Sequence, residues 1–501
     1  MTARRIELHP DRLFPAEPTT RAIARRLHAE VAELPIVSPH GHCDPRWWAD
    51  DEPFPDPTSL LVTGDHYLLR MFHSQGLPLE RLGRRPLDGS GEVASPREAW
   101  RTFCEGFHLF RGTPSRLWLE HALAEGLGVD LVPSAETADE TFDRLSARLA
   151  EPDCRPRALF DRFRIDFLAT TESPLDDLAH HRRIRDSGWG GRVVTAFRPD
   201  AVVDPDHPDF VANLDRLAEL TGRDTATWDG YLAALADRRR TFADHGATST
   251  DHGHPSAATA DLSPAEAAAL FARVRSGRRD HTPAEAEAFR GQMLTEMVRM
   301  SLDDGLVVQL HPGSWRNHDP LTHRRFGPDA GADLPTRTGY VAELKPLLDR
   351  FGNEPGLTLV LFTLDETAYS RELAPLAGHY PLLRLGAPWW FHDSVEGMRR
   401  FRRQVTETAG YANTVGFTDD TRALLSIPAR HDVSRRVDCG HLAQLVAEHR
   451  LTEDDAAAVA VDLAHRLARR TYRVDEPPAA ARSDAVRPAT AWSDDGSGSA
   501  R

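Results

Sequence analysis

The stretch Leu34-Pro35-Ile36-Val37-Ser38-Pro39-His40-Gly41-His42-Cys43-Asp44 is a short apolar run that ends in two histidines one residue apart. Side chains alternate between the faces of a strand, so those of His40 and His42 leave the same side and can converge on one point. Imidazole is a common zinc ligand, and a catalytic zinc site needs about three protein ligands. Alternatively, the two histidines only end a strand and meet solvent, which is the commoner role of an isolated H-x-H. The rest of the chain decides between these readings.

The size and composition are those of a globular protein. The chain has 501 residues, of which 40% are hydrophobic and 27% charged, and it exceeds the roughly 250–300 residues that a single core usually supports. We therefore expect one large domain over residues 1–475 that contains a sizeable insertion. From residue 476 to 501, Pro, Ala, Ser, Asp and Gly dominate, which predicts a disordered tail.

The net charge and the cysteine content limit the classes of binding partner and the cellular compartment that we expect. The net charge of −15 opposes non-specific nucleic-acid binding, although a few inward arginines could still receive a small anion. The four cysteines are scattered without a C-x-x-C pattern, so neither a disulfide framework nor a thiolate zinc site is indicated. No signal-peptide-like or membrane-spanning apolar run is present. We expect a cytoplasmic protein with no nucleic-acid partner and no membrane partner.

Short apolar segments alternate with helical ones along most of the chain, which predicts an α/β fold with a buried parallel sheet. Residues 19–33 read as a helix with Thr19 or Thr20 as N-cap, and Thr282 with Glu285 has the capping-box spacing. Residues 244–282 read as a long loop with short helical pieces. The strand-like segments are 34–38, 165–171, 192–197, 306–310, 357–362 and 414–417.

The absence of two nucleotide-binding motifs and the presence of one long segment without strands indicate the architecture. The sequence has no G-x-G-x-x-G after the first strand and no phosphate-binding loop motif. Residues 45–160 have no convincing series of strands and predict a mainly helical insertion after the first strand. Repeated strand–helix units over this length favour a (β/α)8 TIM-type barrel, whose chemistry lies at the C-terminal ends of the strands.

Polar residues follow several of the predicted strands. Asp420 follows a late strand and is a candidate third metal ligand, although an Asp there is more often a helix N-cap. Arg422 could bind a carboxylate with its planar fork, or could pair with a neighbouring aspartate. Arg198 and His311 also stand at strand ends, where an isolated Arg is usually in a surface ion pair and an isolated His is usually structural.

Two further clusters carry polar or aromatic groups. His66 and Tyr67, at a predicted helix start, are candidates for a proton shuttle and a hydroxyl partner, whereas Tyr67 could simply be a core residue. The run Trp389-Trp390-Phe391 is expected to pack the barrel, with one ring lining the pocket.

Taken together, these motifs resemble the uronate isomerases, an aldose–ketose isomerase branch of the amidohydrolase superfamily, from about residue 34 to 437. A departure is Glu172-Ser173, where the family pattern is expected to have two acidic residues. The resemblance rests on His40-Gly41-His42, Gly64-Asp65-His66-Tyr67, Arg198-Pro199-Asp200, Asp251-His252-Gly253, Gln309-Leu310-His311-Pro312-Gly313, Arg316-Asn317, Trp389-Trp390-Phe391-His392-Asp393, Thr418-Asp419-Asp420-Thr421-Arg422 and Arg430-His431.

The resemblance implies a site as well as a fold. It implies that His40, His42 and Asp420 hold a divalent metal, with zinc expected. The sugar acid would be surrounded by Arg198, Arg422, Trp389, Asp251, His66 and Tyr67, with His311 in the same pocket. Family members commonly self-associate, so a homo-oligomer is expected.

The resemblance also implies a reaction: interconversion of D-glucuronate and D-fructuronate, with D-galacturonate and D-tagaturonate as a second pair. Asp420 is the expected general base, and His66, Tyr67 and His311 are the expected further catalytic groups. One alternative is a metal-dependent hydrolase of an amide, lactone or ester, which would have no evident need for two inward arginines. Another is a catalytically silent sugar-acid-binding protein.

Overall fold

A curled parallel sheet forms the centre of the molecule. The computed structural model describes residues 4–277 and 281–476. Seven strands pair in parallel in the order β1-β2-β3-β4-β5-β8-β9, and a parallel bridge from Leu385 to Thr414 extends the sheet. Each strand thus lies beside the next one along the chain, which confirms the predicted barrel class. The strands are β1 (Ile36–Ser38), β2 (Ile165–Glu172), β3 (Val193–Phe197), β4 (Ser249–His252), β5 (Val307–Leu310), β8 (Leu359–Leu361) and β9 (Leu383–Leu385).

The barrel interior is filled by apolar side chains. Val37, Phe167, Val360 and Val415, from four different strand segments, belong to one buried cluster. Tyr472, which follows the last helix, joins this cluster, and its hydroxyl donates to Gln309 Oε1 at 2.7 Å. The C-terminal segment therefore closes the end of the barrel opposite the strand-end polar residues.

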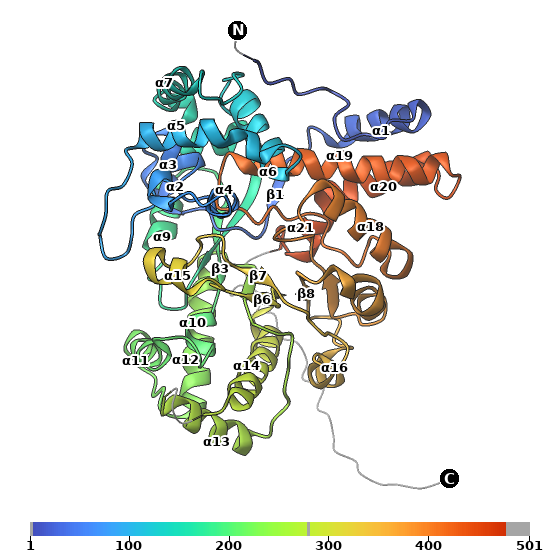
Figure 1. Ribbon diagram of the computed structural model, residues 1–501. Coiled ribbons are helices and arrows are strands. Elements are labelled where there is room, and N and C mark those ends of the chain that lie inside the picture. Colours follow the sequence, from blue (N-terminus) through green and yellow to red (C-terminus); the bar gives the residue numbers. More distant parts are fainter. Residues whose placement is uncertain (1–3, 278–280, 477–501) are drawn as a thin grey trace.

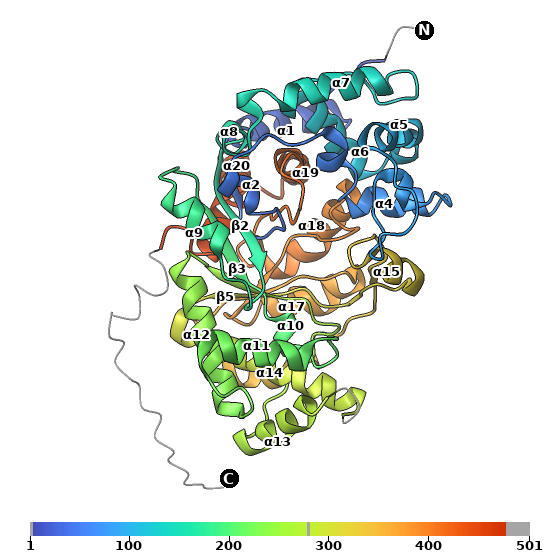
Figure 2. The same cartoon turned by 90° about the vertical axis from the view of Figure 1, so that its left-hand side faces the viewer.

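The chain between β1 and β2, which the structure describes throughout and where a helical insertion is expected, contains helices and connecting loops and no strand other than an isolated bridge from Leu131 to Arg5. These helices gather at one end of the molecule, and α10 to α14 lie at the other end (Figures 1 and 2). The insertion helices are α2 (Arg46–Asp50), α3 (Pro57–Leu61), α4 (His66–His73), α5 (Pro96–Gly106), α6 (Pro114–His121), α7 (Ala138–Leu149) and α8 (Pro156–Arg162).

The other helices cover the sheet or extend from it. Helices α1 and α19 lie side by side and share a buried apolar cluster that includes Leu27 and Leu442 (Figure 1). A small antiparallel pair, β6 (Ser314–Trp315) and β7 (Leu334–Pro335), follows β5. The helices are α1 (Pro18–Val31), α9 (Ala179–Asp186), α10 (Asp200–Val203), α11 (Phe210–Thr221), α12 (Trp228–Asp244), α13 (Pro264–Arg275), α14 (Pro283–Asp304), α15 (Pro320–Phe326), α16 (Lys345–Phe351), α17 (Ala374–Ala377), α18 (Val395–Ala409), α19 (Ser426–Ala447), α20 (Glu453–Val461) and α21 (Leu467–Thr471).

Two local expectations were wrong, and the sequence did not indicate β9. The expected loop with short helical pieces at 244–282 contains a strand, β4, and a 12-residue helix, α13. The N-cap of α1 is Glu17, whose carboxylate accepts from the backbone of Thr19 and Thr20. The capping box of Thr282 and Glu285 is confirmed.

The predictions about membrane spans and about domain bounds can be compared with the structure only over the described residues. None of the helices in residues 4–277 and 281–476 combines the length and apolar character that a membrane span needs. The single domain over 1–475 stays a prediction, and the expected tail lies outside the described residues except for Glu476.

Candidate active site

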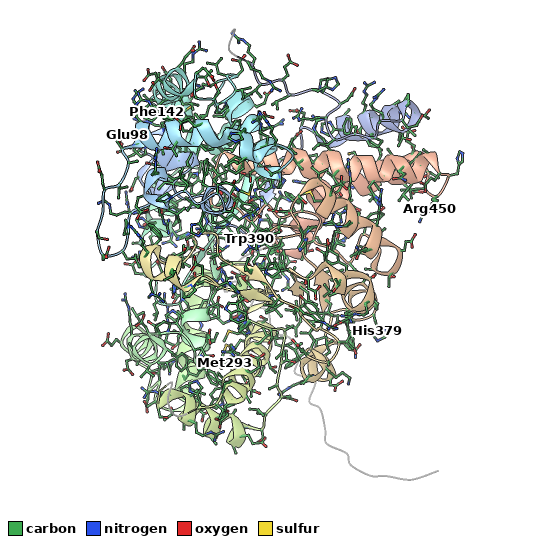
Figure 3. All side chains as sticks on the ribbon, viewed as in Figure 1. Glu98, Phe142, Met293, His379, Trp390 and Arg450 are labelled. Carbon is green, nitrogen blue, oxygen red and sulfur yellow. The ribbon has the colours of Figure 1, made fainter. Side chains whose placement is uncertain are left out.

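A cavity of about 480 Å³ opens at the C-terminal ends of the strands. Trp390, near the centre of Figure 3, lies between the insertion and the barrel, and its Nε1 donates to the carbonyl of Asp333 at 2.8 Å. The cavity is lined by His40, His42, Asp65, His66, Tyr67, Arg198, Asp200, His311, Ser314, Arg316, Pro328, Asp329, Gly331, Asp333, Trp389, Trp390, Asp420, Thr421, Arg422, Ala423 and Arg430.

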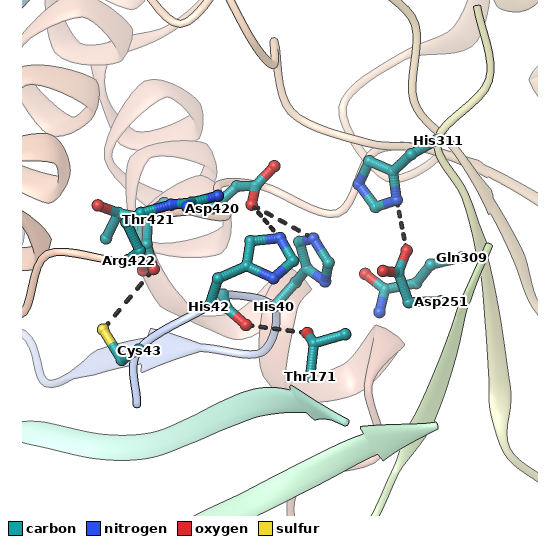
Figure 4. Close-up of polar contacts among 12 residues, drawn as sticks. His40, His42, Cys43, Thr171, Asp251, Gln309, His311, Asp420, Thr421 and Arg422 are labelled. Atoms are coloured by element: carbon teal, nitrogen blue, oxygen red, sulfur yellow. Dashed lines mark hydrogen bonds and ion pairs between the residues drawn. The ribbon is translucent and has the colours of Figure 1, made fainter. Parts of the chain in front are cut away.

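The two histidines after β1 converge on one carboxylate oxygen. His40 Nε2 lies 3.4 Å and His42 Nε2 lies 3.2 Å from Asp420 Oδ1 (Figure 4). Three potential ligand atoms therefore meet at one wall of the cavity. Two come from the segment after the first strand, and one comes from the segment after the Thr414 bridge.

This donor set fits a divalent metal ion. Zinc binds His nitrogen and carboxylate oxygen at about 2.0–2.2 Å, so neighbouring ligand atoms of a tetrahedral site lie about 3.4 Å apart. The 3.4 and 3.2 Å separations at Asp420 Oδ1 match that edge. His40, His42 and Asp420 are therefore the residues that could hold a metal.

Asp420 has a left-handed backbone conformation and a lowered carboxyl pKa. Its φ of 40° lies in the left-handed region, which a non-glycine residue adopts at a cost in conformational energy and which is frequent at functional sites. Burial alone would raise its carboxyl pKa, but the His40 and His42 imidazoles outweigh burial and hold the pKa well below its ordinary value. The residue is thus a carboxylate near neutral pH.

Gly41 allows the two sides of this site to approach each other. A Cβ atom at Gly41 would lie 3.2 Å from the carbonyl oxygen of Thr421, which also accepts from the backbone N–H of His42 at 2.9 Å. The hydrogen bond joins the end of β1 to the segment that contains Asp420. The glycine between the two histidines therefore allows the two backbone segments to approach each other. The spacing of the histidines directs both of their side chains to the same side.

A buried chain of polar contacts supports His311. Its Nδ1 lies 2.7 Å from Asp251 Oδ1 (Figure 4). Arg198 Nη1 lies 3.0 Å from Asp251 Oδ2. Burial lowers the pKa of His311 to about 4, so its ring is neutral near pH 7. Since an ionised Asp251 can only accept, Nδ1 carries the ring proton and Nε2, which has no protein partner, keeps its lone pair.

The insertion contributes His66 and Tyr67 at the first turn of α4. Asp65 caps this helix by accepting from the backbone N–H of Tyr67 at 2.8 Å. The Tyr67 hydroxyl donates to Asp393 Oδ2 at 2.6 Å, and Arg430 binds the same oxygen at 2.7 Å. Burial and the nearby Arg422 lower the pKa of His66 well below its ordinary value, so its imidazole is neutral.

Each cavity arginine has a carboxylate partner. Two of these partners, Asp329 and Asp333, come from the segment between α15 and β7 and are cavity residues that the sequence did not indicate. Arg422 Nη2 lies 3.2 Å from Asp329 Oδ1, and Arg316 Nη1 lies 3.1 Å from Asp333 Oδ2. Their segment has no strand-end position or motif, so only the fold reveals them.

Most of the predicted site residues line this one cavity. Asp251 does not line the cavity, because its side chain is buried behind His311 and Arg198. Asp420 and Arg422 both face the cavity, although the described strand character ends at the Thr414 bridge. The residues brought together are His40, His42, His66, Tyr67, Arg198, His311, Trp389, Asp420 and Arg422.

Comparison with known proteins agrees with this geometry. The family model for glucuronate isomerase matches residues 18–471. The chain belongs to the glucuronate isomerase family. A uronate isomerase of Phenylobacterium zucineum is 64% identical over 481 residues, which cover 95% of this chain and 100% of the relative.

Solved structures of the same family share the fold. A glucuronate isomerase from Caulobacter crescentus superposes with a TM-score of 0.93 at 57% identity, over 97% of this chain and 100% of that chain. A uronate isomerase from Thermotoga maritima superposes with a TM-score of 0.86 at 27% identity, over 93% and 99% of the two chains. The cavity of this glucuronate isomerase family member thus lies in a fold shared along the whole length of its relatives.

Proposed function

We propose that the protein interconverts D-glucuronate and D-fructuronate, and also accepts D-galacturonate and D-tagaturonate. One observation carries the proposal: in a member of the glucuronate isomerase family, a metal-fitting His40, His42 and Asp420 cluster and four arginines share a single cavity. A sugar acid needs both, because its reacting C1–C2 end and its carboxylate lie at opposite ends of the molecule.

The arginines provide the grip on the substrate. Arg422 is 31% exposed, and its partner Asp329 is 43% exposed, so a substrate carboxylate can displace this aspartate. A guanidinium binds a carboxylate through two parallel hydrogen bonds. Arg198 is held by Asp251 and Asp200, so its charge is fixed for an oxyanion that develops in the reaction.

A zinc ion at His40, His42 and Asp420 would polarise the hydroxyl and carbonyl oxygens at C1 and C2 as a Lewis acid. Asp420 Oδ1 faces both imidazoles, which leaves Oδ2 to accept the proton from C2 and return it to C1. The carbonyl then passes from C1 to C2 while a hydroxyl proton passes from O2 to O1. His66, Tyr67 and His311 lie where they can relay this second proton or assist ring opening.

Isotope transfer tests the role of Asp420 as base. With C2-deuterated glucuronate in H₂O, the deuteron that the carboxylate takes from C2 can exchange with solvent before it returns to C1, so we expect part of the label to be lost from C1. Full retention of deuterium at C1 would contradict a carboxylate base that exchanges with solvent during turnover.

The second candidate function is metal-dependent hydrolysis of an amide, lactone or ester, because the same His40, His42 and Asp420 set can activate water. Comparing ketose formation from glucuronate with hydrolysis of sugar lactones by the purified protein separates the two. We expect ketose formation and no lactone turnover, and the reverse result would favour the hydrolase.

We further propose a homo-oligomer in the cytoplasm with no nucleic-acid or membrane partner. The scattered, buried free cysteines support a reducing compartment, and the net charge of −15 opposes non-specific nucleic-acid binding. The homo-oligomer is proposed from the family resemblance. Size-exclusion chromatography with light scattering measures the oligomeric state.

A further inference from the structure

The tripeptide His-Gly-His occurs a second time, at the end of another barrel strand. His252-Gly253-His254 begins at the last residue of β4, whereas His40-Gly41-His42 begins two residues after the end of β1. The proposed function uses neither His252 nor His254, and neither side chain lines the cavity. The repeated pattern therefore needs an explanation of its own.

The second pair of histidines also converges on an aspartate. One nitrogen of His252, one of His254 and one carboxylate oxygen of Asp200 all lie within 4.8 Å of one another. The pattern of ligand types is the one found at His40, His42 and Asp420: two imidazoles from one strand end and one carboxylate from a different segment.

Both imidazoles are buried and each has a nitrogen without a partner. His252 is 0% and His254 is 4% exposed, and His252 Nδ1 and His254 Nε2 make no hydrogen bond to the protein. Buried polar atoms are nearly always satisfied, so an unsatisfied nitrogen on each of two imidazoles that cluster with a carboxylate supports a ligand that the protein itself does not supply. His252 Nε2 lies 3.1 Å from Thr250 Oγ1; when Nε2 donates there, Nδ1 keeps the lone pair that a metal requires.

Gly253 has the same structural role as Gly41. A Cβ atom at Gly253 would lie 2.8 Å from Asp200 Oδ2, closer than real side chains come. Its backbone N–H donates to Asp200 Oδ1 at 3.1 Å, which holds the carboxylate beside the two histidines. In both tripeptides the glycine lets the segment with the third ligand approach.

We propose that His252, His254 and Asp200 form a second site for a divalent transition-metal ion, with zinc as the best match to two imidazoles and a carboxylate. The ion lies in the cavity wall, outside the space for the sugar acid. Because Asp200 Oδ2 also accepts from Arg198 Nε at 2.8 Å, the ion fixes the carboxylate that orients this arginine. The site is structural and does not depend on the reaction proposed for the cavity.

Cobalt titration of the metal-free protein tests the proposal. After dialysis against dipicolinate, Co²⁺ is added without oxygen, and the visible absorbance of the bound ion is followed. We expect absorbance to rise to about two equivalents in the wild-type chain and to about one in His254→Gln. His40 belongs to both other histidine–aspartate groups among the described residues, His40 with His42 and Asp420 and His40 with Asp251 and His311, so His40→Gln is also expected to bind about one equivalent.

The control is His28→Gln, which replaces a half-buried histidine of α1 outside every such group and should still bind about two equivalents. Saturation of the wild-type chain at about one equivalent, or retention of two by His254→Gln, would overturn the proposal. Circular dichroism checks that His254→Gln is folded. If it does not fold, His40→Gln decides, because a variant that binds no cobalt contradicts the second site.

Discussion

At the scale of single residues, Asp420 combines a left-handed backbone, two imidazole contacts and a place in the cavity wall. Asp420→Asn keeps the shape but removes the charge and the proton acceptor. We expect kcat for glucuronate isomerisation to fall by about 10²–10⁴-fold, the usual contribution of a general base. Asp454→Asn, an exposed change in α20, is the control and should be neutral. Full turnover by Asp420→Asn would refute the assigned role.

Asp329 competes with the substrate carboxylate for Arg422 if the binding proposal is correct. Burial raises the pKa of Asp329 and Arg422 lowers it, with the net result a pKa of about 2, so Asp329 is ionised near pH 7. Asp329→Asn should lower KM about threefold by weakening this competition. Steady-state kinetics measure the change, with Asp319→Asn at the N-cap of α15 as control, since Asn keeps the α15 cap. A raised KM would show that Asp329 helps to bind the substrate.

The residues of the site differ in how far the sequence could predict them. His40, His311 and Asp420 each follow an apolar strand segment, and the barrel topology brings such positions to one end. Asp329 and Asp333 reach the cavity from a segment without periodic pattern, so their role depends on tertiary contacts alone. Asp251 was predicted at the substrate, but it contacts His311 and Arg198 instead.

At the scale of elements, β2 contains a carboxyl group that makes stability depend on pH. Burial raises the pKa of Glu172 to about 7, against an ordinary value of 4.5, although the Thr170 hydroxyl donates to it at 3.0 Å. Between these values the folded state binds more protons than the unfolded state, so stability falls as pH rises, by about 3 kcal/mol in total.

Glu172→Gln should remove this dependence. We expect the free energy of unfolding of the variant, relative to wild type, to increase by about 3 kcal/mol between pH 5 and pH 8, as measured by urea denaturation. Glu105→Gln, at an exposed position of α5, controls for loss of a charge. A constant difference between variant and wild type across this range would rule out a raised Glu172 pKa.

Predictable and unpredictable strands differ in composition. The apolar and β-branched runs that became β2, β3 and β5 follow ordinary strand preference. In contrast, β4 is the polar sequence Ser249-Thr250-Asp251-His252, yet all four residues are buried. Its side chains serve the polar network around His311 and Asp200, so local hydrophobicity does not reveal the strand.

At the scale of the whole molecule, the two ends of the barrel are closed by segments far apart in the sequence. The insertion brings His66 and Tyr67 to the cavity, and the chain after α21 brings Tyr472 to the opposite end. Neither closure could be predicted from periodicity, because each depends on where a distant segment packs.

Substitutions of Tyr472 measure how much the C-terminal closure of the barrel contributes to the free energy of unfolding. The residue is 0% exposed and its hydroxyl donates to Gln309 Oε1 at 2.7 Å. Tyr472→Ala should lower the free energy of unfolding by about 3–5 kcal/mol through loss of buried ring contacts. Tyr472→Phe should lower it by about 1–3 kcal/mol, because it keeps the ring and leaves one buried acceptor unpaired. Equal effects in chemical denaturation would show that the ring does not close the barrel.

The most direct test of the proposed activity follows the reacting carbon itself. D-Glucuronate labelled with ¹³C at C1 is incubated with purified protein of known metal content and observed by ¹³C NMR. Isomerisation predicts that the label passes from a hemiacetal carbon to a hydroxymethyl carbon, and that Asp420→Asn slows this change. A label that stays in the hemiacetal with metal-loaded wild-type protein would contradict the proposed function.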